Sequence, residues 1–231
     1  MLTREQEKVI RSLSTKKGRD SSGLCLVEGK KVIETAGSAV VYTFGPNDTT
    51  RFFQLVTTET PQARAGVARI PQWSIRDVAS RDVVVVLDGV QDPGNVGAIL
   101  RLCLGYGAGL VLVESADITN PKVVRASVGS LFQVPWVRVR REGAAEALAA
   151  FDRPIYRLEK KAGAKIFDAH KIKTPCLFIA GSEGAGIQLE IIGESIAIPH
   201  NDALESLNIG HALAIILYSI SDANRSSDTN E

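Results

Sequence analysis

The stretch VVVVLDGVQDPGNVGAILR, residues 83–101, establishes the fold class of this chain of 231 residues. Its first part, Val83–Leu87, is an apolar run without alternation, which is typical of a parallel-sheet strand covered by helices on both faces. The second part predicts a helix at about residues 95–105, which opens beside two glycines and carries Asn95 at its entrance and Arg101 about two turns further in. A helix that serves packing alone needs neither polar residue, so capping, surface solvation or a ligand must explain them.

Three further apolar runs follow along the chain: LVLV at 110–113, CLFIA at 176–180 and SIAI at 195–198. Helices are predicted in the same part of the chain, at about residues 95–105, 121–128, 143–150, 187–193 and 207–220. This order of strands and helices indicates an α/β domain with a parallel sheet over residues 79–231. The polar tail DANRSSDTNE, residues 222–231, lacks periodicity and is predicted to be disordered.

The first 78 residues predict a separate small α/β unit. Its elements are a helix at Thr3–Leu13, a strand at Leu24–Val27, a helix at Gly29–Ala36, a strand at Ala39–Phe44, a strand near Phe52–Thr57 and a helix near Pro61–Arg69. The glycine- and serine-containing stretch STKKGRDSSG, residues 14–23, is predicted to be a basic loop. We find no internal repeat.

Composition narrows the protein class. A content of 45% hydrophobic and 23% charged residues is ordinary for a folded, soluble protein. No apolar run approaches the roughly 18 residues of a membrane span, and the charged N-terminus MLTREQEKVIRSL does not suit a signal peptide. We therefore expect a cytoplasmic protein.

Cysteine and histidine usage argues against disulfides and metal. The cysteines are odd in number, far apart and apolar in context, so we expect buried thiols at Cys25, Cys103 and Cys176. The histidines lack metal-binding spacing, so we expect no metal ion at His170, His200 or His211.

Positive charge is concentrated in two stretches although the formal net charge is only +1. Residues 1–31 contain eight Lys and Arg against four Asp and Glu, and residues 157–173 contain six against two. A solvated surface explains either stretch alone. Within the predicted basic loop, three cations are candidate contacts for an RNA phosphate path: Lys16, Lys17 and Arg19.

Three glycine-bearing loops follow predicted strands, at residues 88–101, 181–186 and 199–208. In open α/β sheets, ligands bind at the carboxyl ends of the strands. The loop GSEGAG, residues 181–186, has neither the dinucleotide-binding pattern G-x-G-x-x-G nor the Lys-Ser/Thr of a Walker loop. Its Glu183 would repel a pyrophosphate, so the loop suits a neutral or cationic ligand.

Three stretches, in this order and spacing, resemble the motifs of the SpoU (TrmH-like) RNA ribose 2′-O-methyltransferases of the SPOUT superfamily: DPGNVGAILR at 92–101, FIAGSEGAGI at 178–187 and IPHNDALESLN at 198–208. RASVGSLFQVPW, residues 125–136, resembles the segment that this family carries between its first two motifs. LSTKKGRDSSGLCLVEGKKVIETA, residues 13–36, is similar to the small substrate-binding domain of many members. The resemblance covers about residues 13 to 220.

The resemblance implies an S-adenosylmethionine-dependent enzyme that methylates a ribose 2′-hydroxyl of structured RNA, with rRNA and tRNA both left open. Residues 1–78 would bind RNA, and residues 79–231 would form a SPOUT-type catalytic domain with a C-terminal trefoil knot, a rare exception to the rule that chains do not thread their own loops. Family members generally act as homodimers and bind the cofactor in the knot.

Carried over by position, the resemblance also implies site residues. The cofactor-binding residues would be Gly181, Glu183, Ile198, Pro199, Leu207 and Asn208, with Gly181 allowing a close approach because it lacks a Cβ. The catalytic residues would be Arg101, Asn95, Ser206 and Asn208. Methyl transfer from a sulfonium is an in-line displacement that depends on positioning, so few side chains suffice. We expect Asn95 to cap and orient its helix and Arg101 to bind an RNA phosphate or stabilise oxyanion charge, since a guanidinium keeps its proton.

Two departures and two alternatives remain. The family commonly has Met where this chain has His200, and Gly210 and His211 replace residues that are usually a serine or valine and a small residue. These differences bear on substrate selection, because the expected cofactor contacts come from backbone. A non-catalytic RNA-binding or ribosome-assembly protein on the same fold is the main alternative. A nucleotide-binding oxidoreductase lacks its glycine fingerprint.

Overall fold

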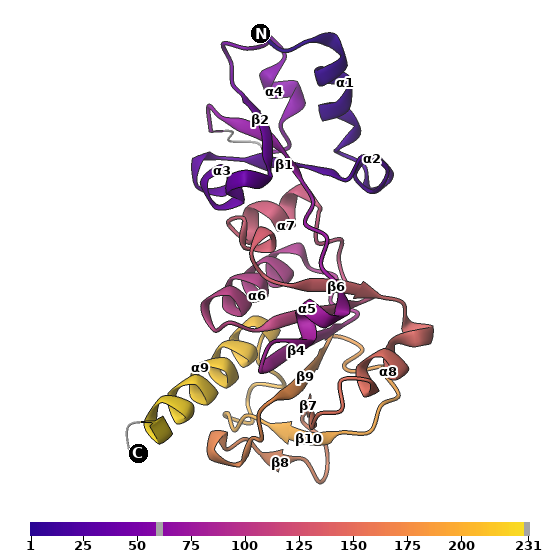
Figure 1. Ribbon diagram of the computed structural model, residues 1–231. Coiled ribbons are helices and arrows are strands. Elements are labelled where there is room, and N and C mark those ends of the chain that lie inside the picture. Colours follow the sequence, from indigo (N-terminus) through magenta and orange to yellow (C-terminus); the bar gives the residue numbers. More distant parts are fainter. Residues whose placement is uncertain (59–61, 229–231) are drawn as a thin grey trace.

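The computed structural model describes residues 1–58 and 62–228 and contains two sheets (Figure 1). A three-stranded sheet in the order β1-β3-β2 belongs to the N-terminal unit, and a seven-stranded sheet in the order β6-β5-β4-β9-β7-β10-β8 belongs to the C-terminal unit. Every strand pairing in the larger sheet is parallel. The predicted α/β class with a parallel sheet is therefore confirmed.

The four apolar runs of the sequence form strands of the large sheet, as predicted. They are β4 (Val83–Asp88), β5 (Gly109–Val113), β9 (Cys176–Gly181) and β10 (Glu194–Ala197). Three strands escaped prediction because they are short and lack a continuous apolar run: β6 (Trp136–Val139), β7 (Ile155–Leu158) and β8 (Lys165–Ile166).

Alternate residues of β4 face opposite sides of the sheet, and both sides are buried. Val85 and Leu87 pack in a cluster with residues of three helices, α6 (Pro93–Gly105), α7 (Pro121–Ala126) and α9 (Ile209–Asp228). Val84 and Val86 pack with residues of α5 (Ile75–Ala79) and α8 (Arg141–Ala149). This two-sided cover is the reason why four of the six residues of β4 are valines.

Two predictions in the C-terminal unit are wrong. Residues 187–193 do not form a helix, because side chains elsewhere in the fold hold their backbone groups. The tail is not disordered from residue 222, since α9 continues to Asp228, and residues 229–231 lie outside the described part. The described tail residues continue a helix whose apolar side chains, among them Leu213 and Leu217, already pack on the sheet.

The N-terminal unit comprises α1 (Arg4–Ser12), α2 (Lys16–Ser22), β1 (Leu24–Glu28), α3 (Lys30–Ala36), β2 (Val40–Phe44), α4 (Phe52–Leu55) and β3 (Ala65–Arg69). Three predictions are wrong here. The basic loop is the helix α2, capped by the Thr15 hydroxyl, the strand near Phe52–Thr57 is the helix α4, and the helix near Pro61–Arg69 is the strand β3, with Pro61 outside the described residues. Strand β3 pairs with β1 on one side and with β2 on the other. Its sequence AGVAR consists mostly of small residues, so it gave no strand pattern.

Among the described residues, three ion pairs join the units: Arg19 with Asp117, Arg125 with Glu28 and the more exposed Arg138 with Asp20. The Arg19 guanidinium, 3% exposed, donates to Asp117 and Thr119, and Arg125 donates to Glu28 and Thr57. The prediction of Arg19 as an RNA contact is therefore wrong, because its side chain is buried, unlike those of Lys16 and Lys17. The ion pair of Arg19 instead holds α2 against the loop that precedes α7.

The expected thiols are confirmed, because Cys25, Cys103 and Cys176 are free and buried. Burial raises the pKa of each thiol to about 12, so none is a ready nucleophile. Within the described ranges, no group of three acidic, His or Cys side chains is placed to hold a metal ion. In the same residues, no helix has the length and apolar character of a membrane span.

Candidate functional site

Three loops at the carboxyl ends of the parallel strands bring Asn95, Glu183 and Asn208 together. The Glu183 Oε1 atom accepts hydrogen bonds from Asn95 Nδ2 at 3.2 Å and from Asn208 Nδ2 at 3.1 Å. Asn208 Nδ2 also donates to Asn95 Oδ1 at 3.0 Å. The structure thus joins one residue from each of the three motifs, which lie up to 113 positions apart in the chain.

Capping of helix α6 differs from the prediction. The N-cap of α6 is Asp92, whose carboxylate accepts from the Asn95 backbone N–H at 2.7 Å. The Asn95 side chain is therefore free to face Glu183, so the predicted capping role of Asn95 is wrong. Asn208 Oδ1 accepts from the Gly210 N–H at 2.9 Å, so Asn208 both caps α9 and completes the polar cluster.

Arg101 lies on the exposed surface of α6, two turns after Asn95. Among the residues that the structure describes, its guanidinium has no hydrogen-bond or ion-pair partner. An arginine without an internal partner is available for a phosphate or an oxyanion. Helix α6 also contacts α9, which follows the third loop, so Arg101 belongs to the same part of the molecule as the polar cluster.

Gly181 is required by its own loop. A Cβ on Gly181 would lie 2.0 Å from the Gly186 carbonyl carbon and 2.3 Å from the Ile187 nitrogen. A bridge between Ser182 and Gly186 closes the loop across this space. The missing side chain therefore lets the loop turn back and present Glu183.

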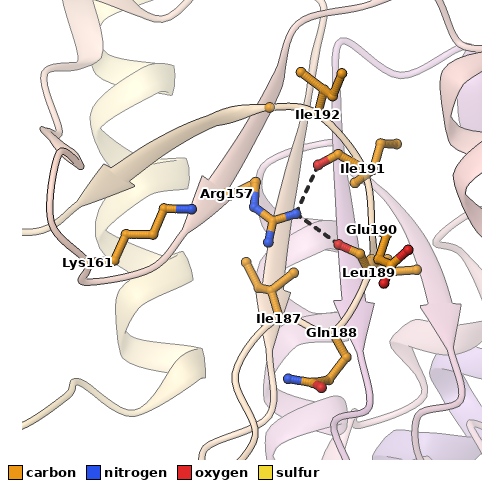
Figure 2. A pocket seen from close by; sticks show the side chains of 9 residues that line it. Arg157, Lys161, Ile187, Gln188, Leu189, Glu190, Ile191 and Ile192 are labelled. Carbon is orange, nitrogen blue, oxygen red and sulfur yellow. Dashed lines mark hydrogen bonds between the residues drawn. The ribbon is translucent and has the colours of Figure 1, made fainter.

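The segment after this loop is extended because its backbone groups bond to side chains. Arg157 Nη1 donates to the carbonyl oxygens of Leu189 and Ile191, each at 3.0 Å (Figure 2). The buried Asp88 carboxylate, at the end of β4, accepts from the N–H groups of Gln188 at 2.6 Å and Leu189 at 2.7 Å. These contacts hold the backbone of residues 188–191 in place directly after the second motif loop.

A cavity of about 120 Å³ lies beside the carboxyl ends of β7 and β10. Its lining includes three predicted site residues, Ile198, Ser206 and Leu207. It also includes residues that sequence analysis missed: Leu158, Glu159, Lys160, Ile196, Ala197, His200 and Ala212. The signal for Leu158–Lys160 was hidden because β7 itself was not predicted.

Other predicted cofactor residues lie outside this lining. Gly181, Glu183 and Asn208 lie in the neighbouring loops, and Pro199 lines an adjacent cavity of about 580 Å³ with Ile198. The smaller cavity is below the roughly 300 Å³ of typical ligand sites, so it fits one flat ring of a ligand whose remainder lies outside it. Its mixed lining, with apolar Leu158, Ile198 and Leu207 beside polar groups, suits a purine.

Glu159 gives this cavity an ionised carboxylate that is paired with two cations. Burial alone would raise its pKa, but hydrogen bonds from Arg157, Lys161 and Ser195 outweigh that effect and lower the pKa to about 2. The Glu159 carboxylate lies 3.0 Å from Arg157 and 2.7 Å from Lys161. Because the two cations hold the carboxylate, it shapes the lining and remains ionised at neutral pH.

The sequence model of the SpoU rRNA Methylase family matches residues 82–218. The chain is 30% identical to the 23S rRNA (guanosine(2553)-2'-O)-methyltransferase RlmP of Bacillus subtilis, over 90% of this chain and 92% of that protein. This chain belongs to the SpoU family. The match confirms the resemblance drawn from the three motifs, which supply Asn95, Glu183 and Asn208 to the polar cluster.

Solved structures agree with the SpoU assignment. An AdoMet-bound rRNA methyltransferase from Sinorhizobium meliloti is similar with a TM-score of 0.79 and 27% identity, over 98% of this chain and 96% of that one. The SpoU methyltransferase AviRb from Streptomyces viridochromogenes, in complex with AdoMet, is similar with a TM-score of 0.78 and 25% identity, over 97% and 99%. The expectations of a SpoU-type RNA 2′-O-methyltransferase and of S-adenosylmethionine as its cofactor are confirmed.

Proposed function

We propose that this SpoU-family enzyme transfers the methyl group of S-adenosylmethionine to a ribose 2′-hydroxyl of ribosomal RNA. The observation that carries the proposal is the cluster of Asn95, Glu183 and Asn208, formed by all three motif loops beside a cavity whose mixed apolar and polar lining suits a purine. The choice of rRNA over tRNA is supported by relatives named as 23S rRNA 2'-O-methyltransferases.

Leu158, Ile198 and Leu207 would hold the adenine ring of the cofactor. Bound S-adenosylmethionine supplies a methyl group on a cationic sulfonium, which is already activated for in-line displacement. The Glu183 carboxylate, positioned by the two asparagine amides, provides a negative charge that suits a cationic ligand.

Arg101 binds the RNA in this proposal. A guanidinium keeps its proton, so Arg101 acts by binding a phosphate and by stabilising the oxyanion that develops on the ribose, and not as a base. Ser206, exposed in the loop before α9 and in the cavity lining, lies where it can contact the ribose or the cofactor. Asn95 and Asn208 orient Glu183 and the start of α9.

The main alternative, a non-catalytic RNA-binding or ribosome-assembly protein, is disfavoured. Such a protein has no need to preserve an unpartnered arginine together with the polar cluster. A methylation assay with tritiated S-adenosylmethionine and rRNA fragments, followed by mapping of 2′-O-methyl groups, tests the proposal. Absence of 2′-O-methyl transfer to any rRNA fragment, when cofactor binds, would favour the alternative.

Four finer expectations stay within the proposal. We propose that residues 1–78 form the RNA-binding domain and that residues 79–231 form the catalytic domain, although Val78 of α5 packs against the C-terminal sheet. We propose the trefoil knot that the resemblance implies, and a cytoplasmic location. We also propose a homodimer, supported by exposed apolar side chains on the contacting helices α6 and α9: Leu104, Ile215 and Tyr218. Light scattering would give the mass of the particle in solution.

A further inference from the structure

His200 follows the end of β10 by three residues and lines the proposed adenine cavity with Leu158, Ile198 and Leu207. Its side chain is half-buried. The sequence resemblance places His200 where the family commonly has Met. The structure therefore puts a polar ring at a position of the cavity wall where an apolar chain is common.

The ring of His200 has a fixed orientation. Its Nδ1 atom lies 2.8 Å from the Ile198 carbonyl oxygen. Because a carbonyl oxygen only accepts hydrogen bonds, Nδ1 carries the proton. In the neutral imidazole the other nitrogen, Nε2, is then an acceptor.

The Nε2 acceptor lacks a donor. Nε2 is buried, and within residues 1–58 and 62–228 it has no hydrogen-bond partner. A buried acceptor without a donor is unfavourable, so a ligand that supplies an N–H group at this place gains affinity. The lining also contains two polar donors, Lys160 and Ser206, but neither bonds to Nε2.

We propose that His200 is a specificity-determining residue of the cofactor pocket, whose Nε2 atom accepts a hydrogen bond from the 6-amino group of the adenine. This rests on the proposed function, because it takes the ring in the cavity to be the purine of S-adenosylmethionine. The amino group is the N–H donor that projects from the edge of a purine, whereas the ring faces suit Leu158, Ile198 and Leu207. Methionine at position 200 would keep the apolar packing and remove the acceptor.

Calorimetry with S-adenosylhomocysteine tests this assignment without relying on turnover. His200→Met should weaken binding by about three- to tenfold, the fold-change expected for one neutral hydrogen bond. His211→Met, at an exposed position at the start of α9 outside the cavity lining, is the matched control and should bind like the wild type. Equal affinity of the wild type and His200→Met would overturn the assignment.

A second ligand separates loss of the hydrogen bond from loss of fold. The analogue of S-adenosylhomocysteine with an unsubstituted purine lacks the 6-amino group. The wild type should bind this analogue about three- to tenfold more weakly than S-adenosylhomocysteine, whereas His200→Met should bind the two ligands alike. An equal preference for the amino group in both proteins would overturn the role of His200 even if the variant binds weakly.

The binding experiment gives a different result if the proposed function itself is wrong. If the wild type bound neither ligand, the cavity would not be a cofactor site, and both proposals would fall together. If the wild type bound S-adenosylhomocysteine and His200→Met bound it equally well, the cofactor site would stand and the assignment of His200 alone would fall.

Discussion

The two sheets of this protein differ in how they are held. The seven-stranded sheet is covered by helices on both faces and carries the motif loops at its carboxyl edge. The three-stranded sheet of the N-terminal unit is docked on the rest by an apolar contact, in which Cys25 and Val27 join the larger core, and by the ion pairs of Arg19 and Arg125. The cofactor scaffold therefore depends on burial at both faces of its sheet, whereas the predicted RNA-binding unit is positioned by one shared apolar contact together with ion pairs.

Breaking the Arg19 ion pair should have the largest effect. Arg19→Ala leaves the 13% exposed Asp117 with only the more distant and more exposed Arg138, so the free energy of unfolding should fall by about 3 kcal/mol, the low end for breaking a buried pair. Urea denaturation followed by fluorescence measures this. Lys30→Ala, which removes an exposed ion pair with Glu34, is the control and should change little. Equal losses of unfolding free energy in the two variants would show that the Arg19–Asp117 pair does not stabilise the contact between the two units.

Removing the Arg101 side chain should lower catalysis at the site that the larger sheet carries. Arg101→Ala should lower the turnover number by about 100- to 1,000-fold, because one charged group that stabilises the transition state is removed. Affinity for S-adenosylhomocysteine should stay within about twofold, since Arg101 lies outside the cavity lining. Arg140→Ala, an exposed arginine that precedes α8 on the opposite face of the sheet, is the matched control. Near-normal turnover of Arg101→Ala would refute the catalytic assignment.

The acid stability of the cofactor scaffold should depend on Glu159. Its pKa in the folded protein is about 2, below the ordinary value of 4.5, so its contribution to stability is present above about pH 4.5 and is lost as the pH falls toward 2. The Glu159→Gln variant should therefore be less stable than the wild type at neutral pH. Its stability should also fall less steeply below pH 4.5. Unfolding midpoints measured from pH 7 to pH 3 test this. The exposed Asp202→Asn variant serves as the control, and identical pH profiles for Glu159→Gln and the wild type would exclude the effect.

The smallest effect is expected at the surface of α2. Lys16 and Lys17 are exposed there, so changing both to Ala should flatten the plot of log RNA affinity against log salt by about 0.7 to 0.9 for each RNA phosphate that the variant no longer binds. Cofactor affinity should not change, because both lysines belong to the N-terminal unit. RNA binding measured over a salt series tests this prediction. Parallel lines at equal affinity would show that α2 only faces solvent.

Sequence patterns succeeded where burial is regular. The continuous apolar runs predicted β4, β5, β9 and β10, and the spacing of apolar residues predicted α6 and α9. The patterns failed in the N-terminal unit, where α4 and β3 were exchanged. Phe52 and Leu55, three positions apart, both face the core, which is helical spacing that the aromatic residues obscured.

Prediction of the site residues likewise succeeded for short motifs and failed for contacts that depend on the fold. The motifs identified Asn95, Glu183 and Asn208, because such residues are recognisable in their local sequence. They did not show that Asp92 caps α6 or that Arg19 is buried. They also missed Glu159 as a member of the cavity wall, since strand β7 carries no clear pattern, and they missed His200, whose place in the wall depends on the fold.

Local sequence was enough to establish the family, the parallel α/β sheet and the order of the three motif loops, because these depend on hydrophobic periodicity and on residue types within short stretches. Which side chains meet was settled by the tertiary structure alone. Glu183 bonds to Asn95 across 88 positions, and Arg19 reaches Asp117 across 98. Such contacts depend on how strands are ordered in the sheet and on which charges the packing removes from water, and a local pattern contains neither.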